Sequence, residues 1–422
     1  MLKLSKIKIV SVGLLLIAIN LVWPVYDGFA HKGKVPFPPF YQFVEIPQHS
    51  PTEQLLYQKK YSETANHALN LLTQHKKTIN APAISAAVAI DGNLVWAGVS
   101  GWSDIEGKIP VTTNTQFRIG STSKALTGAA LARMVDANLI NIDKPISDYI
   151  KDLPNSTWGK VTPRQLASHT AGLPHYKENT DYLGLYKTIS LNTRYQNVED
   201  ALTIFDGSEL LYEPGSQFSY STFGTVLLSA VMENAANTPY LDIMQKQVFS
   251  PLKMNATMAE FNGESSKDLA TFYWNKKGAS SHVRKWRNVD LSHRLAGGGF
   301  ISTSSDLAKM GIALLQDDFI STETRNAFWT PQTLPDGSET PNGYALGWRY
   351  MTIKVDDEFG EITLANHGGV SRGAQSWLMV IPEHNMSVAV NINANTDIFW
   401  DFGKVSMQLA KVFILAKNKA QL

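Results

Sequence analysis

Cysteine is absent from the 422 residues of this chain. This absence excludes disulfide bonds, cysteine metal ligands and a thiol nucleophile. Charge is also scarce, because charged residues make up 18% of the chain and the formal net charge is +1. A balance this close to neutral argues against a nucleic-acid-binding surface. The hydrophobic fraction of 44% is sufficient for one large domain, or two smaller ones, with an ample core.

One apolar run, residues 9–23, stands near the N-terminus. Three lysines precede it, namely Lys3, Lys6 and Lys8. The run is shorter than the ~20 residues of a comfortable membrane span, and residues 28–30 (GFA) offer the small residues of a signal-cleavage site. We therefore expect residues 1–30 to be a cleaved signal peptide or an uncleaved inner-membrane anchor formed by residues 9–26. In both cases the lysines keep the N-terminus cytoplasmic and the body of the protein is exported to the periplasm.

The rest of the chain divides by pattern. Residues 31–53 are rich in proline and aromatic residues without a period, which predicts a linker. Residues 54–139 and 296–422 contain strand patterns, whereas residues 140–295 are mostly helical and loop-like. The simplest architecture is an α/β domain built from both ends of the segment 54–422, with an all-helical insertion between them.

Individual elements can also be predicted. A helix is expected over residues 52–77, and a hairpin with strands at 83–90 and 94–99 surrounds Asp91-Gly92-Asn93. Later strands are predicted at residues 345–355, 361–365, 375–381 and 386–392. Later helices are predicted at residues 162–168, 222–235, 305–315 and 397–415, the third capped by Ser304 or Ser305.

The strongest chemical signal is the S-x-x-K pair Ser121 and Lys124, which opens an apolar helix after Gly120. Residues three apart share one helix face, so the hydroxyl and the amine would be neighbours, as a nucleophile and its base must be. The unpaired N–H groups of the first helical turn would favour a developing oxyanion. The same spacing occurs elsewhere in the chain, and a capping serine beside a solvated lysine would also satisfy it.

Further segments make the chain resemble the serine β-lactamases and penicillin-binding proteins, in particular the class C branch with its related esterases and D-amino-acid peptidases. The resemblance covers roughly residues 54–415. The segments that carry it are residues 166–174 (LASHTAGLP), 214–221 (PGSQFSYS), 251–254 (PLKM), 296–303 (AGGGFIST) and 367–369 (HGG). The resemblance implies the β-lactamase/transpeptidase-like fold, an antiparallel β-sheet flanked by helices.

The same resemblance implies roles for single residues. Tyr220 would be the second catalytic group beside Ser121 and Lys124. The backbone N–H groups of Ser121 and Val370 would form the oxyanion hole. His367, Gly368 and Gly369 would lie on a strand that edges the site, and His367 would donate a hydrogen bond to the substrate or to the tyrosine. Whether Lys124 or a Tyr220 phenolate accepts the serine proton stays open at this point.

One position departs from the family pattern. Thr222 stands where the family usually has an asparagine that contacts the substrate. A threonine hydroxyl cannot present both an amide donor and a carbonyl acceptor. The substitution therefore argues against efficient β-lactam turnover more than against acyl-enzyme chemistry.

Two alternatives concern other motifs. Residues 369–373 (GVSRG) match the G-x-S-x-G elbow of α/β-hydrolases around Ser371, but the residues that follow have a strand pattern, and that fold needs a helix there. His169 and His175 could suggest a metal, but no third ligand stands at a sensible spacing, so both are predicted to be structural.

The sequence thus predicts an exported serine hydrolase of the peptidase or esterase type. Its substrate would be a small molecule or peptide with an amide or ester carbonyl, and no metal, organic cofactor or nucleic acid is implied. A class C-like β-lactamase is one alternative. A binding or scaffold protein of the same fold, with weak or lost chemistry, is the other.

Overall fold

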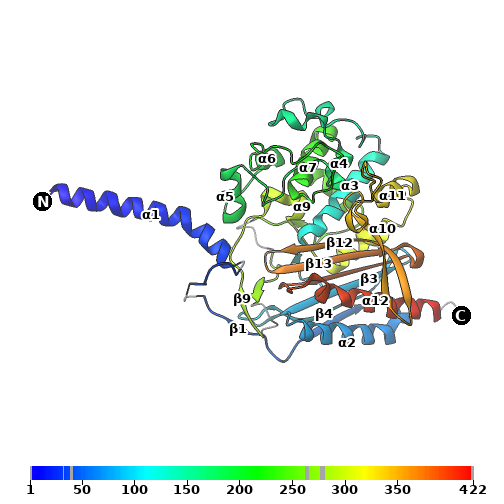
Figure 1. The fold of residues 1–422 in the computed structure, drawn as a ribbon. Coiled ribbons are helices and arrows are strands. Elements are labelled where there is room, and N and C mark those ends of the chain that lie inside the picture. The colour runs from blue at the N-terminus through cyan, green and yellow to red at the C-terminus, as the bar shows by residue number, and fades with distance from the viewer. Residues whose placement is uncertain (1, 32, 39–40, 262–265, 276–280, 420–422) are drawn as a thin grey trace.

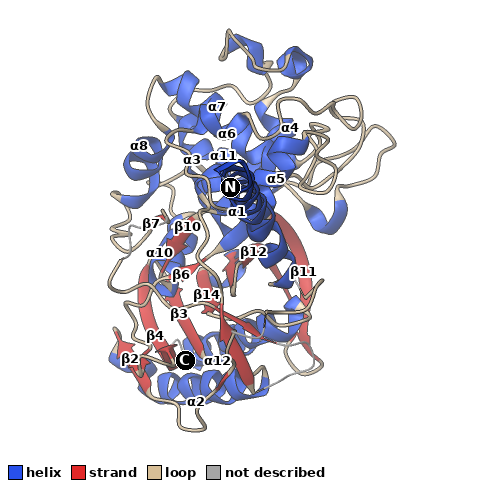
Figure 2. Cartoon of the chain, turned by 90° about the vertical axis from the view of Figure 1, so that its left-hand side faces the viewer, coloured by secondary structure: helices blue, strands red, loops and turns tan. Residues whose placement is uncertain are grey.

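The computed structural model describes residues 2–31, 33–38, 41–261, 266–275 and 281–419. Its centre is an eight-stranded antiparallel sheet in the order β11-β12-β13-β14-β3-β4-β2, with β5 paired to β4 (Figures 1 and 2). These strands are β2 (Thr52–Leu56), β3 (Ala83–Ile90), β4 (Asn93–Asp104), β5 (Ile109–Pro110), β11 (Arg349–Asp356), β12 (Gly360–Ser371), β13 (Ala374–Ile381) and β14 (Met386–Ile392). The pairing of β14 with β3 joins the two distant parts of the chain in one sheet.

The two faces of this sheet are both buried, which explains why its inner strands are apolar at nearly every position. In β3, Ala86 and Val88 belong to the core beneath α2 (Ser62–Thr78) and α12 (Phe399–Lys419). Ala87 and Ala89 point the other way, into the core shared with α3 (Ser123–Asp136) and α10 (Ser304–Ala313). Alternate residues of a strand face opposite sides, so each strand supplies both cores.

The remaining helices lie largely above the sheet in Figure 1, on the side of α3. They are α4 (Pro163–Ser168), α5 (Tyr182–Ser190), α6 (Val198–Leu202), α7 (Thr222–Ala236), α8 (Tyr240–Met244), α9 (Leu295–Gly298) and α11 (Thr322–Trp329). Two small sheets complete the fold, in the orders β6-β10-β7 and β1-β9-β8. Their strands are β1 (Val44–Glu45), β6 (Phe117–Arg118), β7 (Met258–Ala259), β8 (Tyr273–Asn275), β9 (His282–Lys285) and β10 (Phe300–Ser302).

The predicted fold class, an antiparallel sheet flanked by helices with helical structure inserted, is confirmed. Several local predictions were wrong. Thr52–Leu56 is an edge strand and not the start of a helix, so the segment predicted as a linker enters the sheet and also contains β1. The cap of α10 is Thr303, whose side chain accepts from the Asp306 N–H, and not Ser304 or Ser305. β12 extends six residues beyond the end that its pattern predicts, through the glycines at 368 and 369, which agrees with the strand that the family resemblance implied for residues 367–369.

The N-terminal apolar run forms the long helix α1 (Leu2–Ala30), which projects from the body (Figure 1). Ile9–Ala30 spans 22 residues and is long and apolar enough to cross a membrane. The judgement from sequence that the run is too short was therefore wrong, because the helix continues through Pro24 instead of ending at it.

Candidate active site

Ser121 lies in a single turn of 3₁₀ helix, Gly120–Thr122, that leads directly into α3. Gly120 has a φ of +51°, and a Cβ atom there would lie 2.7 Å from the carbonyl carbon of Val370 on β12. Glycine alone tolerates both the left-handed backbone and this contact. The Gly120-Ser121 sequence therefore lets the start of α3 touch the main sheet and places Ser121 at the junction of the sheet and the helical part.

Lys124 is buried one turn further on, with a side chain that is only 1% exposed. Its Nζ lies within hydrogen-bonding distance of Ser121 Oγ at 3.4 Å, Thr222 Oγ1 at 3.1 Å and the Gly297 carbonyl at 2.7 Å. A neutral amine can donate to the carbonyl and to Thr222 and still offer its lone pair to the Ser121 hydroxyl. The Tyr220 ring centre lies 4.8 Å from the same Nζ. The hydroxyl, the amine and the phenol ring thus come together from three distant parts of the chain, and a solvated lysine beside a capping serine is excluded.

The environment sets the protonation of this cluster. Burial lowers the pKa of Lys124 well below its usual value, and the charges of Arg294 and Arg349 lower it further. Burial also raises the pKa of Tyr220 to about 12, although a hydrogen bond with the Ser121 hydroxyl and the Arg349 charge oppose this rise. Both shifts favour a neutral amine beside an intact phenol. Of the two bases that the sequence left open, these shifts disfavour a Tyr220 phenolate.

Two histidines fix the start of α7, where Tyr220 lies. His169 Nδ1 accepts the backbone N–H of Ser221 at 3.4 Å, and His175 Nδ1 accepts that of Thr222 at 3.2 Å. These are donors that a helix N-terminus otherwise leaves unpaired. The His169 ring also packs on Tyr220, with ring centres 4.2 Å apart. Both histidines therefore have structural partners, and the described residues contain no group of three or more side chains that could hold a metal ion.

A residue that the sequence analysis missed, Tyr344, connects this region to β12. His169 Nε2 and His367 Nε2 lie 2.9 and 3.0 Å from the Tyr344 hydroxyl, and His367 Nδ1 lies 2.8 Å from the Gly368 carbonyl. A carbonyl only accepts, so His367 carries its proton on Nδ1 and accepts from Tyr344. His169 Nδ1 accepts from Ser221, so its Nε2–H donates to Tyr344. All four ring nitrogens are satisfied in one buried, directional chain of hydrogen bonds.

No local pattern marks Tyr344. It sits in residues 343–348 (GYALGW), outside the segments that carry the family resemblance, and its partners are 175 and 23 positions away. The only available signal was the cluster of glycine and aromatic residues immediately before β11.

The edge of β12 faces Ser121 at close range. A Cβ atom on Gly369 would lie 2.9 Å from the Ser121 backbone nitrogen and 1.9 Å from the Ile119 carbonyl oxygen. The ladder between β11 and β12 ends at the Arg349–Asn366 pair, so the following residues of β12 have no β11 partner on that edge. Gly368 and Val370 line the adjoining cleft, as does Ser121. Backbone N–H groups of Ser121 and Val370 thus lie on adjacent segments, as an oxyanion hole requires.

Two predicted substrate contacts are placed differently. Thr222 is 3% exposed and does not line the cleft, because its hydroxyl accepts from Lys124 and its methyl group packs against Gly297. His367 is fully buried, and the tyrosine that it bonds is Tyr344 and not Tyr220. Both side chains therefore contact other residues of the site from within the protein and do not face the cleft.

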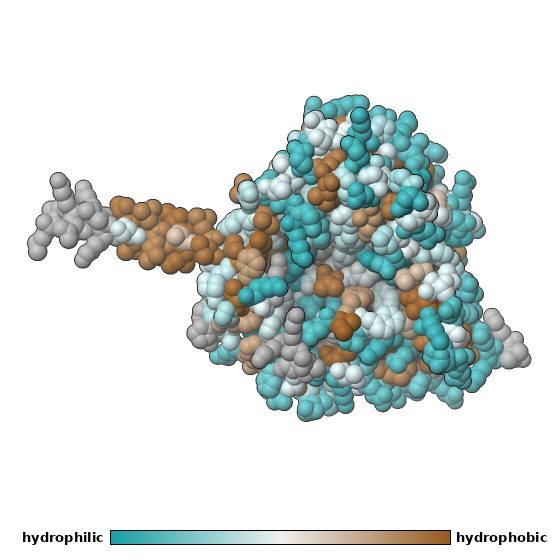
Figure 3. Space-filling view, in the orientation of Figure 1, coloured by the Kyte–Doolittle hydropathy of each residue, from teal (hydrophilic) through white to brown (hydrophobic). Residues whose placement is uncertain are grey.

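The cleft itself has a volume of about 680 Å³. Its lining residues are Ser121, Tyr220, Asn342, Arg349, Met351, Thr352, Ile353, Asn366, Gly368, Val370, Trp377, Phe399 and Trp400. Apolar and aromatic side chains dominate this set, Arg349 is its only charged member, and none is acidic. The space-filling view shows brown residues gathered around a hollow on the body of the protein (Figure 3).

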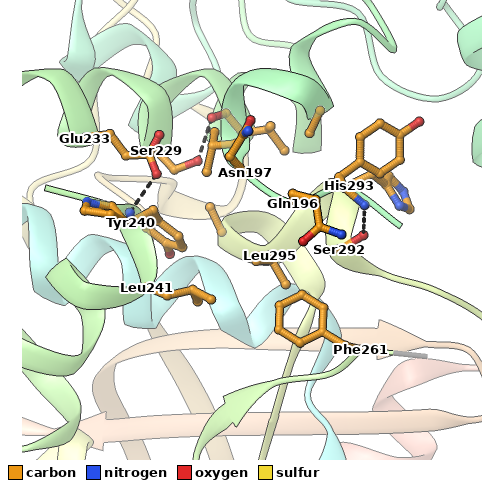
Figure 4. A pocket seen from close by; sticks show the side chains of 16 residues that line it. Gln196, Asn197, Ser229, Glu233, Tyr240, Leu241, Phe261, Ser292, His293 and Leu295 are labelled. Atoms are coloured by element: carbon orange, nitrogen blue, oxygen red, sulfur yellow. Dashed lines mark hydrogen bonds between the residues drawn. The ribbon is translucent and has the colours of Figure 1, made fainter. Parts of the chain in front are cut away.

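A second cavity, in the helical part, differs in character. It holds about 90 Å³, and side chains including Gln196, Leu241, Phe261 and Leu295 surround it (Figure 4). Its lining contains Glu233 and His293 but neither Ser121 nor Lys124. Of the two cavities, the larger cleft is therefore the one that Ser121 lines.

The rival elbow around Ser371 fails on geometry. Ser371 ends β12, Gly373 turns with a φ of +75°, and β13 follows at once. Strand–turn–strand replaces the strand–turn–helix that a nucleophile elbow needs. The Ser371 hydroxyl is 4% exposed and accepts from Arg294 at 3.4 Å.

Comparison with known proteins agrees with this geometry. The family model described as Beta-lactamase matches residues 69–400. The chain belongs to the beta-lactamase family. This family is of the serine-hydrolase type, and the match includes the segments around Ser121, Tyr220 and Gly369.

Individual relatives support the family assignment. The chain is 30% identical over 412 residues to the human (Homo sapiens) serine beta-lactamase-like protein LACTB, mitochondrial, covering 78% of this chain and 74% of that protein. It is 26% identical to penicillin-binding protein 4* of Bacillus subtilis (strain 168), covering 72% and 67%. A solved structure described as a class C beta-lactamase superposes with a TM-score of 0.66 at 17% identity, covering 84% of this chain and 98% of that one. This last likeness establishes the fold alone.

Proposed function

We propose that this protein is a serine hydrolase that cleaves an amide or ester through an acyl-enzyme on Ser121, with peptidase- or esterase-like activity. The observation that carries the proposal is the 3.4 Å contact between Ser121 Oγ and the buried Nζ of Lys124, whose pKa is held well below its usual value. A neutral amine is a competent base for a serine hydroxyl. The family match supports the same chemistry.

The proposed steps use the residues of this cluster. Neutral Lys124 takes the proton from Ser121 Oγ as the oxygen attacks the substrate carbonyl. The oxyanion that forms is held by the N–H groups of Ser121 and Val370, and the nearby Arg294 and Arg349 charges favour it. Lys124 then gives the proton to the leaving amine or alcohol, and the carbon–heteroatom bond breaks. The Tyr220 phenol, which hydrogen-bonds Ser121, orients the reacting oxygen. Water, deprotonated by the same amine, attacks the ester carbonyl. The bond between the acyl carbon and Ser121 Oγ breaks, Lys124 returns the proton to that oxygen, and the acid leaves.

The cleft also suggests which acyl compounds fit. Met351, Trp377, Phe399 and Trp400 form an apolar wall that would accept an aliphatic or aromatic arm. Arg349 is the one charge in the lining, and its guanidinium lies 5.1 Å from the Tyr344 ring centre. We therefore propose substrates that combine an apolar arm with an anionic group near the scissile carbonyl.

An Arg349→Met variant tests this preference. It should lower kcat/KM for a p-nitrophenyl ester bearing a carboxylate by about 10- to 100-fold more than for the matched neutral ester, as expected for a lost hydrogen bond to a charged group. The loss on the neutral ester measures what the Arg349 charge contributes to Lys124 and the oxyanion. Equal losses on both esters would remove Arg349 from substrate recognition.

The location is also a proposal. Because Lys3, Lys6 and Lys8 precede the apolar run, we infer that the N-terminus stays cytoplasmic and that the catalytic part lies in the periplasm. A topology reporter fused after residue 419 checks this orientation, and a signal from the cytoplasmic side would contradict it.

A labelling experiment tests the central proposal. A fluorophosphonate or a fluorescent penicillin should label the wild-type protein on Ser121, and the label should disappear in Ser121→Ala. A folded wild-type protein that takes no label from either probe would favour the binding or scaffold alternative. A panel of nitrocefin, D-alanyl peptides and short-chain p-nitrophenyl esters then separates peptidase, esterase and β-lactamase activity, and fast nitrocefin turnover would favour the β-lactamase alternative.

A further inference from the structure

The helix α1 has two parts with different surroundings. Ile9–Trp23 is exposed to solvent nearly throughout, whereas burial begins at Pro24, and Asp27, Ala30 and His31 are at most 5% exposed. In Figure 3 the exposed part is a brown rod that stands away from a body with a mostly teal and white surface. The second part, residues 24–31, is instead packed into the body beside α5.

Asp27 is the centre of this attachment, which we name the Asp27 latch (residues 27–31 with Tyr41 and Arg287). Its carboxylate accepts from the Tyr41 hydroxyl at 2.5 Å and lies 3.2 Å from His31 Nδ1 and 3.5 Å from Arg287 Nε. Arg287 in turn donates to the carbonyls of Ser190 and Ile189 at the end of α5. A buried carboxylate surrounded in this way belongs to the folded core of the protein.

The backbone of the latch is also hydrogen-bonded. The N–H groups of His31, Gly33 and Lys34 donate to the carbonyls of Asp27, Ala30 and Phe29 at 2.9–3.0 Å. A Cβ atom at Gly28 would lie 2.9 Å from the Ile189 carbonyl oxygen. The three residues of the expected cleavage site are therefore helical and held against α5, with Ala30 0% exposed. Although the Phe29 side chain is 36% exposed, Gly28 and Ala30 are part of the packed fold, and that fold is complete only if they stay on the chain.

The chain beyond the latch extends the attachment. The Arg284 guanidinium is covered by aromatic rings, with Phe37 and Tyr41 centred 3.0 and 4.7 Å from its carbon. Val44 and Glu45 then pair with β9 as strand β1. The segment between the apolar helix and the main sheet is thus packed against the body at several points.

We propose that α1 is retained in the mature protein as a membrane anchor, and that the Asp27 latch docks the catalytic body directly at its end. Cutting after Ala30 would remove the buried carboxylate and leave the partly buried Arg287, whose side chain is 11% exposed, without its charged partner. Removing one member of such a pair is the costly way to break it. The proposal concerns the N-terminus alone and stands whether or not Ser121 is a nucleophile.

In this proposal a lipid bilayer surrounds the exposed part of α1. The helix exposes apolar residues on all sides from Ile9 to Trp23, with no side buried against the protein. Trp23 and Tyr26 stack with ring centres 6.0 Å apart where the helix meets the body. Tryptophan and tyrosine favour the membrane–water interface, so this pair marks the level at which the helix leaves the bilayer. The sequence supplies lysines at the opposite end, which suit the cytoplasmic headgroups.

The N-terminus of the mature protein tests retention. The full chain is expressed in a Gram-negative host, membranes are washed with alkaline carbonate, and the intact mass of the protein is measured. We expect a membrane-bound protein that retains residues 2–30. A soluble periplasmic protein that begins at His31 would overturn the proposal.

The latch is tested by thermal unfolding of the full chain in detergent. Asp27→Ala should lower Tm by more than about 2 °C, because a buried charged partner is lost. Asp317→Ala is the matched control, since Asp317 also pairs with an arginine, Arg325 at 3.2 Å, but its side chain is 73% exposed, and it should change Tm little. Equal Tm values for the two variants would show that the latch does not hold the helix to the body.

Discussion

Replacement of Tyr344 by phenylalanine tests the hydrogen-bond chain behind the active site. The variant keeps the ring and removes one oxygen, which donates to His367 Nε2 and accepts from His169 Nε2. Each buried polar group left without a partner costs about 1–3 kcal/mol, so the free energy of unfolding should fall by about 2–6 kcal/mol. Burial keeps the pKa of both histidines well below the usual value, so neither can recover by protonation at neutral pH.

Activity should fall as well, because the chain connects the Tyr220 side of the site to the β12 edge. A shift of about 1 Å in such a site can reduce the rate about 100-fold. The assay pairs urea unfolding with kcat on a neutral p-nitrophenyl ester. Tyr240→Phe is the control. Its hydroxyl is equally buried but bonds only Thr127, whose single hydroxyl hydrogen still has a carbonyl acceptor, so the cost should be about 0.5–1.5 kcal/mol with no change in kcat. If Tyr344→Phe loses no more stability or activity than this control, the chain has no positioning role.

Three further predictions concern single side chains. A pH profile on the ester should show kcat/KM falling in acid as Lys124 becomes protonated, with no alkaline decline until the pH nears 12, the pKa of Tyr220. Lys124→Ala should reduce acylation about 10²–10⁴-fold, and an unchanged rate in this variant would contradict the role of Lys124 as base. Ser371→Ala should keep most activity, since its hydroxyl is buried at the end of β12, whereas loss of turnover in a folded variant would revive the elbow hypothesis. Burial lowers the pKa of Lys76 from 10.5 to about 8 in the folded protein. Between these two pH values Lys76 is protonated in the unfolded chain but neutral in the folded one, so the free energy of unfolding rises with pH by up to about 3 kcal/mol. The stability difference between wild type and Lys76→Met, measured by urea unfolding from pH 7 to 10, should follow this slope, and a flat difference would contradict it.

Local sequence signals were sufficient for the elements that carry their own pattern. β14 matches its prediction at both ends, and α7 begins at its predicted residue, because strand alternation and helix capping act between neighbours in the chain. The local sequence signals failed where tertiary contacts determine the secondary structure. Thr52–Leu56 has an apolar pair that suits a helix, but the segment forms an antiparallel strand along the edge of β4. β12 runs through Gly368 and Gly369, residues that disfavour strands in isolation, because β13 pairs with them and the Ser121 turn leaves no room for side chains.

The sequence by itself singled out the Ser121 hydroxyl, the amine three residues later and the Tyr220 phenol, since their spacing and flanking residues are local or belong to ordered family motifs. Only the tertiary structure decided their chemistry. The pKa values of Lys124 and Tyr220 depend on how deeply each is buried and on the charges of Arg294 and Arg349, residues 170 or more positions from Lys124. The same holds for Tyr344 and for the Asp27 latch, because a buried polar group is satisfied by whichever partner the fold brings within about 3 Å, at any distance along the chain.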